Sequence, residues 1–204
     1  MPNTYTIKRV SKDANNIWKT VKPLAISEYP WNNFPYKPET ETRICYTDVF
    51  LRLRFDTAEE NIRAIYTKPN SPVCTDSCVE FFVNADPENS ADYVNFEVNP
   101  IGTMLAGIGE GRHGRTRIEG EAFGMVSIEP FIDSPAWGVE LTIPFAFLEI
   151  FYGKKTFGSG RVMKGNLYKC GDQTRRPHYG CWSRVGCQAP DFHRPEYFGD
   201  LLFE

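Results

Sequence analysis

Short runs of alternating apolar and polar residues are the feature that most constrains how this chain folds. Residues 49–55, 93–99 and 137–143 each alternate in this way over seven positions. A period of two places successive side chains on opposite faces of a β-strand. In the first two runs, the apolar side chains are therefore expected to face a core. These residues are Val49, Leu51, Leu53, Phe55, Val94, Phe96 and Val98.

Three further segments complete the expected set of strands, at residues 78–83, 161–168 and 197–203. Turn-forming residues separate the strands, for example in residues 85–89 and 152–155. We expect residues 78–83 to form a more deeply buried strand than the alternating ones, because polar residues hardly interrupt that run.

Helical patterns are few and short. One covers residues 15–22 around Trp18, and another covers residues 144–151, where Pro144 can occupy the first helical position. No crossover helix long enough for a parallel α/β sheet separates the strands. The sequence therefore predicts an all-β fold, a two-sheet antiparallel β-sandwich of jelly-roll type with one or two short helices, formed by residues 1–204 as a single domain.

Composition excludes several classes of partner. The chain has 204 residues, 41% of them apolar, and a net charge of −3. It therefore has no basic field to attract nucleic acid or anionic lipid. No run approaches the ~20 apolar residues that cross a bilayer. We expect a monomer with no nucleic-acid or membrane partner.

The N-terminus and the cysteines bear on the cellular compartment. Residues 1–10 contain no apolar core of a signal peptide. We expect a cytoplasmic protein with reduced thiols; the alternative is a secreted or periplasmic protein whose leader is absent from this sequence. A Cys170–Cys181 disulfide would suit that alternative. Cys74 and Cys78 lack regularly spaced companions for a zinc site, so we expect structural thiols at positions 45, 74, 78, 170, 181 and 187.

A row of polar side chains follows the 93–99 strand. Asn95, Glu97 and Asn99 share one face, and Glu80 on another strand can point the same way. Such a row can hold vicinal hydroxyl groups; the alternative is a solvated outer face. Glu80 and Glu97 are also the only candidates for a glycosidase carboxylate pair, although no neighbouring residue predicts different pKa values for the two.

Aromatic and polar residues gather in the C-terminal quarter. Trp182, Phe192 and His193 lie in a proline-rich segment, where flat rings can cover the C–H patches of a sugar. The alternative is that these rings close one end of a β-domain. Three polar residues near the preceding loop are candidate hydroxyl ligands, or else scaffold residues of that loop: Asn166, Asp172 and Arg175.

Common catalytic motifs are absent from the sequence. It contains no GxSxG, HExxH or phosphate-binding loop. The glycine-rich residues 107–111 lie between strand-like segments and predict a hairpin turn. The histidines His113, His178 and His193 are scattered, so the sequence leaves any metal site unassigned and predicts no catalytic residues.

Four motifs in order resemble carbohydrate-binding module family 9. They occupy residues 76–83, 93–99, 137–144 and 194–201. The resemblance implies a DOMON-like β-sandwich that binds glucans such as cellulose, or xylans, often at chain ends and without catalysis. It also implies a bound structural calcium in some members and frequent attachment to xylanases. A hydrolytic enzyme remains an alternative function.

The chain departs from the best-known members at their sugar clamp. Those members hold a sugar between two tryptophans, whereas residues 70–75 contain none and Phe192 stands at the second position. Glu97 stands where that family can carry an arginine. The resemblance is thus expected to hold for the fold more than for the ligand. Some DOMON-like proteins bind haem instead, for which Met104, Met163 and His113 are the available residues.

Overall fold

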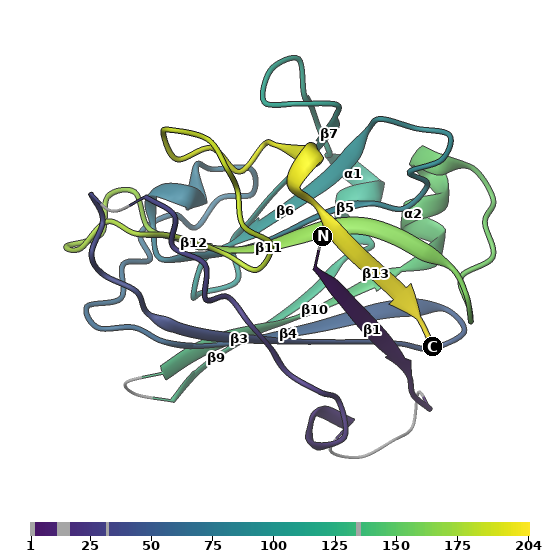
Figure 1. The fold of residues 1–204 in the computed structure, drawn as a ribbon, viewed down its shortest axis with the longest axis horizontal. Coiled ribbons are helices and arrows are strands. Elements are labelled where there is room, and N and C mark those ends of the chain that lie inside the picture. Colours follow the sequence, from purple (N-terminus) through teal and green to yellow (C-terminus); the bar gives the residue numbers. More distant parts are fainter. Residues whose placement is uncertain (1–2, 12–16, 32, 134–135) are drawn as a thin grey trace.

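The strands form two facing layers in the computed structural model, which describes residues 3–11, 17–31, 33–133 and 136–204 (Figure 1). One layer contains β5 (Cys78–Asn84), β6 (Tyr93–Val98), β7 (Met104–Gly109), β8 (Thr116–Arg117), β11 (Val162–Cys170), β12 (Tyr179–Cys181) and β13 (Gly199–Phe203). The other contains β2 (Leu24–Ala25), β3 (Glu39–Tyr46), β4 (Phe50–Ala58), β9 (Ser127–Asp133) and β10 (Ala136–Pro144).

Strand β1 (Thr4–Arg9) joins the two layers. Its first residues pair in parallel with β13, and Lys8 and Arg9 pair in parallel with Cys45 and Tyr46 of β3. The prediction of a mostly β protein is confirmed, but the strictly antiparallel two-sheet arrangement is corrected to one curled, mixed sheet. Alternation within a segment indicates a strand, whereas the partner and direction of that strand depend on contacts distant in sequence.

Most predicted strands occur where the sequence placed them, with corrections at two strand starts. Tyr197, the first residue of the predicted 197–203 strand, belongs to a 3₁₀ turn, and the strand begins at Gly199. Val49 was expected to face the core, but its side chain is 57% exposed. The backbone N–H of Thr47 donates to the carbonyl of Phe50, so Val49 lies in the turn before β4. The buried face of that strand consists of Leu51, Leu53 and Phe55.

Helices are short, as predicted. Of the helix expected over 15–22, residues 15 and 16 lie outside the described residues, and the described part contains a 3₁₀ turn, η1 (Ile17–Lys19). The second expected helix appears as α2 (Phe145–Tyr152). Pro144 precedes α2 as its N-cap with extended backbone and does not occupy the first helical position. The sequence did not predict α1 (Gly120–Gly124) or the 3₁₀ turns η2 (Val73–Thr75) and η3 (Pro195–Tyr197). No helix among the described residues is long and apolar enough to span a membrane.

The core between the layers is one of two large apolar clusters. It contains the inward residues of β4, β5, β6 and β10, including Phe81, Phe96 and Trp137. A second cluster covers the outer face of the β5–β6–β11 layer and includes Phe82, Tyr168 and Phe192. Strands β5 and β6 are therefore buried on both faces. Their outer face is covered by loops, which corrects the alternative of a solvated strand face.

Gly138 of β10 leaves no room for a side chain. A Cβ atom at this position would lie 2.1 Å from the carbonyl oxygen of Phe55 and 2.3 Å from the Phe131 ring. We expect Gly138→Ala to lower the free energy of unfolding by about 1–3 kcal/mol or more, because backbone atoms must move. Urea denaturation measures this, with Gly158→Ala as the control, since nothing lies within 4 Å of that position. Equal stability of the two variants would contradict the packing argument.

Candidate functional site

A small pocket lies on the outer face of the β5–β6–β11 layer. The segment 190–193, just before η3, passes beside it, and its volume is about 100 Å³. An adjoining hollow of about 440 Å³ extends toward the β7–β8 loop and shares Cys74, Glu97, Arg112 and His193 with the pocket. The complete pocket lining is Cys74, Glu80, Glu97, Arg112, Cys170, Asp172, Tyr179, Pro190, Asp191, Phe192 and His193.

Strand register places two carboxyl groups side by side in this pocket. Glu80 of β5 pairs directly with Glu97 of β6, so both side chains leave the same face of the layer. Both are buried. Burial, together with the Glu97 charge, raises the pKa of Glu80 well above its usual range. Burial also raises the pKa of Glu97 to about 7, against the opposing effects of Arg117 and the Asn95 side chain.

Arginines of the β7–β8 loop border the adjoining hollow. Arg115 donates to the Oδ1 atom of Asn95 from Nε at 3.0 Å and from Nη2 at 2.6 Å. The Asn95 amide in turn donates to Glu97 Oε1 at 3.0 Å. Arg112 forms an ion pair with Asp191 at 3.0 Å. Carboxyl, amide and guanidinium groups therefore alternate around the rim, which is an arrangement suited to a polyhydroxy ligand.

Aromatic rings form one wall of the pocket. Phe192 stacks on Tyr168 with ring centroids 4.1 Å apart and an interplanar angle of 12°. His193 packs 4.8 Å from Phe82, and its Nδ1 atom lies 2.7 Å from the Tyr93 hydroxyl. Burial and the nearby Arg115 lower the pKa of His193 to about 3, so the imidazole is neutral at pH 7. This wall offers ring edges and neutral hydrogen-bonding groups to a ligand.

The fold brings together most of the residues predicted for the site. Glu80, Glu97, Asp172, Phe192 and His193 line the pocket, and Asn95 lines the adjoining hollow. These residues meet because side chains from β5, from β6 and from the start of the 171–179 loop lie on the same face of the layer.

Three predicted site residues and one member of the polar row lie elsewhere. Trp182 is buried in the core between the layers. Asn166 donates to the carbonyl of Ser183 and accepts from the Leu167 and Ser183 amides, so its polar atoms hold the loop as the scaffold alternative proposed. Arg175 is exposed and lines neither hollow. Asn99 closes the turn after β6 by accepting from the Thr103 amide.

Sequence reasoning missed the arginines and the cysteines of the pocket. Arg112, Arg115 and Arg117 follow the glycine-rich end of β7, which was interpreted only as a hairpin turn. Three arginines within six residues were the available signal. Cys74 and Cys170 were interpreted as structural thiols, and no local pattern reveals that they reach the same pocket.

The alternative functions gain no support from this geometry. The raised pKa values of the Glu80 and Glu97 carboxyl groups follow from their shared burial and do not single out a glycosidase pair. For haem binding, Met104 and Met163 are buried in the core between the layers and His113 is exposed on a loop. These residues do not form one ligand set.

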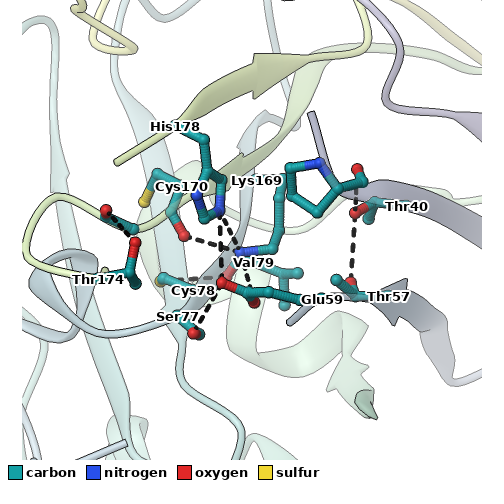
Figure 2. A network of polar contacts seen from close by, with 12 residues as sticks. Thr40, Thr57, Glu59, Ser77, Cys78, Val79, Lys169, Cys170, Thr174 and His178 are labelled. Atoms are coloured by element: carbon teal, nitrogen blue, oxygen red, sulfur yellow. Dashed lines mark hydrogen bonds and ion pairs between the residues drawn. The ribbon is translucent and has the colours of Figure 1, made fainter. Parts of the chain in front are cut away.

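A buried polar network lies beneath the 171–178 loop (Figure 2). The Lys169 ammonium contacts Glu59 Oε2 at 3.0 Å, His178 Nε2 at 2.8 Å and the Cys170 carbonyl at 2.9 Å. Glu59 also accepts hydrogen bonds from Ser77 and from Trp137, both at 2.9 Å. All three donors of the ammonium are thereby used, and the network anchors the loop that carries Asp172 to the layer below it.

The tautomer of His178 follows from its two contacts. Its Nδ1 atom lies 2.8 Å from the Arg176 carbonyl, so Nδ1 carries the proton and Nε2 accepts from Lys169. Burial and the Lys169 charge lower the pKa of His178 to about 4. The network therefore requires a neutral histidine.

All six cysteines lie in the described part of the chain, and their sulfur atoms are unpaired. Cys78, Glu80 and Cys170 place one ligand atom each within 4.8 Å of one another. Calcium binds six to eight oxygen atoms. Two thiols and one carboxyl group therefore do not fit the calcium ion that the family resemblance implied.

The chain is similar to known carbohydrate-binding proteins in sequence and in fold. The sequence model of the protein family described as carbohydrate-binding family 9 matches residues 12–203. The fold is similar to that of a Bacteroides uniformis ATCC 8492 protein to which carbohydrate binding is attributed, with 30% identity, full coverage of both chains and a TM-score of 0.89. A comparison with curated proteins gave no match.

Two more distant structures are complexes of a family 9 module from Caldicellulosiruptor kristjanssonii. One contains glucose, with 13% identity, coverage of 99% of this chain and 96% of the other, and a TM-score of 0.71. The other contains cellotriose, with 12% identity, coverage of 99% and 94%, and a TM-score of 0.71. At this level of identity the likeness concerns the fold.

Proposed function

Because the chain belongs to carbohydrate-binding family 9, as its four motifs predicted, we propose that the pocket beside residues 190–193 holds its sugar ligand. The protein is a carbohydrate-binding module, and it acts without catalysis. The observation that carries the site assignment is the convergence of Glu80, Glu97, Asp172 and Arg112 beside an aromatic wall.

The chemistry of these groups matches a pyranose ring. Sugar hydroxyls donate and accept hydrogen bonds, and the rim offers acceptors at Asp172 and donors at Arg112. Phe192 is nearly buried, with Tyr168 stacked against it, so little of its ring is free for stacking. Recognition in this pocket therefore depends more on polar contacts than a clamp of two tryptophans would.

The ligand class that we propose is a β-linked glucose oligosaccharide, with xylo-oligosaccharides as the second candidate. Glucose and cellotriose occupy the two distant relatives of the same fold. The small pocket suits one terminal ring, and the adjoining hollow of about 440 Å³ can accept the next one. Calorimetry against cello-, xylo- and manno-oligosaccharides tests this proposal. No heat of binding at millimolar sugar would contradict it.

Asp172 is the rim residue best suited to test the site. We expect Asp172→Ala to weaken oligosaccharide binding about tenfold or more, because a lost hydrogen bond to a charged group costs about 1.5–3 kcal/mol. Arg175→Ala is the matched control, since it changes the same loop but lines neither hollow. Equal affinities of the two variants, measured by calorimetry, would show that the sugar binds elsewhere.

A further inference from the structure

Two strands place a set of metal-binding side chains at the pocket floor. Cys78 and Glu80 lie two residues apart on β5, so their side chains share the outer face. Cys170 of β11 pairs directly with Cys78 across the two strands. One ligand atom from each of the three residues lies within 4.8 Å of the others.

The hydrogen bonds of this group are weak. Glu80 is 3% exposed, and among the described residues its carboxyl group accepts only from the Cys170 thiol, at 3.0 Å. The Cys78 thiol donates to the Val79 carbonyl at 3.6 Å and lies beside the Cys170 thiol. Thiols are weak donors. A buried carboxyl group with so weak a partner is costly unless another positive or donating group joins it.

The surroundings favour a cation at this point. Glu97 and Asp172 line the same pocket as Glu80 and Cys170, and Arg112, the cation in the lining, is paired with Asp191 at 3.0 Å. The cluster opens to the pocket through Glu80 and Cys170, both of which line it, so an ion can enter from solvent. The remaining pocket volume leaves room for a water molecule or a solute atom as a further ligand.

We propose that Cys78, Glu80 and Cys170 bind one divalent cation of the zinc class at the floor of the pocket. Zinc accepts thiolate sulfur at about 2.3 Å and carboxylate oxygen at about 2.0–2.2 Å in a tetrahedral arrangement. Ligand atoms on such an ion lie about 3–4 Å apart, which agrees with a cluster contained within 4.8 Å. Mixed sulfur and oxygen ligands select this class over calcium or magnesium.

Binding changes the protonation of the cluster. The protons of the two thiols and of the Glu80 carboxyl group, whose pKa burial raises, pass to solvent. The two sulfur atoms each donate an electron pair to the metal, and Glu80 binds as the carboxylate. Two thiolates and one carboxylate then surround a dication, leaving one net negative charge. No oxidation or reduction is involved. The fourth position points to the pocket, as in zinc sites that keep one exchangeable ligand.

Cobalt titration of the reduced 204-residue protein tests this site. We expect one equivalent of Co²⁺ to produce a thiolate-to-cobalt charge-transfer band, and Zn²⁺ to displace it. Cys78→Ser and Cys170→Ser should each remove the band. Cys45→Ser should keep it, because Cys45 is an equally buried strand cysteine in a separate cluster away from the pocket.

Native mass spectrometry provides a measurement that needs no variant. The wild-type protein should gain the mass of one zinc ion less that of the protons released. The proposal is overturned if no stoichiometric metal binds at micromolar concentration, or if Co²⁺ binds without a thiolate band. A band that survives in the folded Cys78→Ser/Cys170→Ser double variant would overturn it as well. Sugar affinity is not the readout, so this result is independent of the proposed function.

Discussion

We expect the Glu59→Ala variant to unfold with a free energy about 3–5 kcal/mol lower than that of the wild-type protein. Glu59 is the counterion of Lys169, at 3.0 Å, and both side chains are buried. The substitution leaves a buried ammonium without a negative partner and removes the acceptor of the Ser77 and Trp137 hydrogen bonds. Urea denaturation followed by tryptophan fluorescence measures the change.

An exposed ion pair supplies the control for this prediction. Asp48 pairs with Arg9, and both side chains are largely exposed. Asp48→Ala should cost no more than about 1 kcal/mol, because solvent already screens that pair. If Glu59→Ala were as mild as Asp48→Ala, the Lys169–Glu59 pair would not be the anchor of the 171–178 loop.

The second large effect is a loss of stability in mild acid that depends on His178. The pKa of His178 is about 4 in the folded protein, compared with 6.5 for an unperturbed histidine. The unfolded chain therefore takes up this proton first as the pH falls, which shifts the equilibrium toward unfolding. The contribution is fully present above pH 6.5 and is lost toward pH 4. The difference of 2.5 units corresponds to about 3 kcal/mol.

The matched variant for this effect is His178→Gln. Glutamine does not titrate, while its amide can still accept from Lys169 and donate to a carbonyl. We expect the wild-type protein to be the more stable of the two at pH 7 and to lose about 3 kcal/mol of that advantage by pH 4. Other titrating groups, including His193, are common to both proteins and cancel in the difference. A constant difference across this range, from urea unfolding, would contradict the assigned protonation state of His178.

Local pattern indicated six of the strands but missed others, such as β1, β3 and β9, and it gave no information on what surrounds any strand. The alternation at residues 93–99 correctly placed Asn95 and Glu97 on the face opposite Phe96. It could not show that the second apolar cluster covers that face, because the covering residues come from distant segments such as 190–198. From the sequence, the polar row could be either a ligand-binding row or a solvated outer face. In the folded chain the second interpretation is excluded, because loops cover that face.

For single residues of the site as well, the local sequence predicted the type of chemical group, whereas the tertiary structure decided its position. Trp182 and Phe192 were both predicted to contact a sugar, yet Trp182 packs between the layers and Phe192 lines the pocket. Asn166 and Asp172 looked equivalent as polar residues of one loop region. Only the path of the chain distinguishes them, because Asn166 is held by the Ser183 backbone while Asp172 lies at the pocket rim.

The sequence by itself determined six of the thirteen described strand segments, the family and the chemical groups available to a ligand, because these depend on residue order along a short stretch of chain. Tertiary structure alone decided which groups meet. Register across β5 and β11 brings Cys78 to Cys170, and β1 closes the curled sheet by pairing in parallel with two strands. Such pairings join residues far apart in sequence, and their energies come from the packing of whole faces, which no short segment encodes.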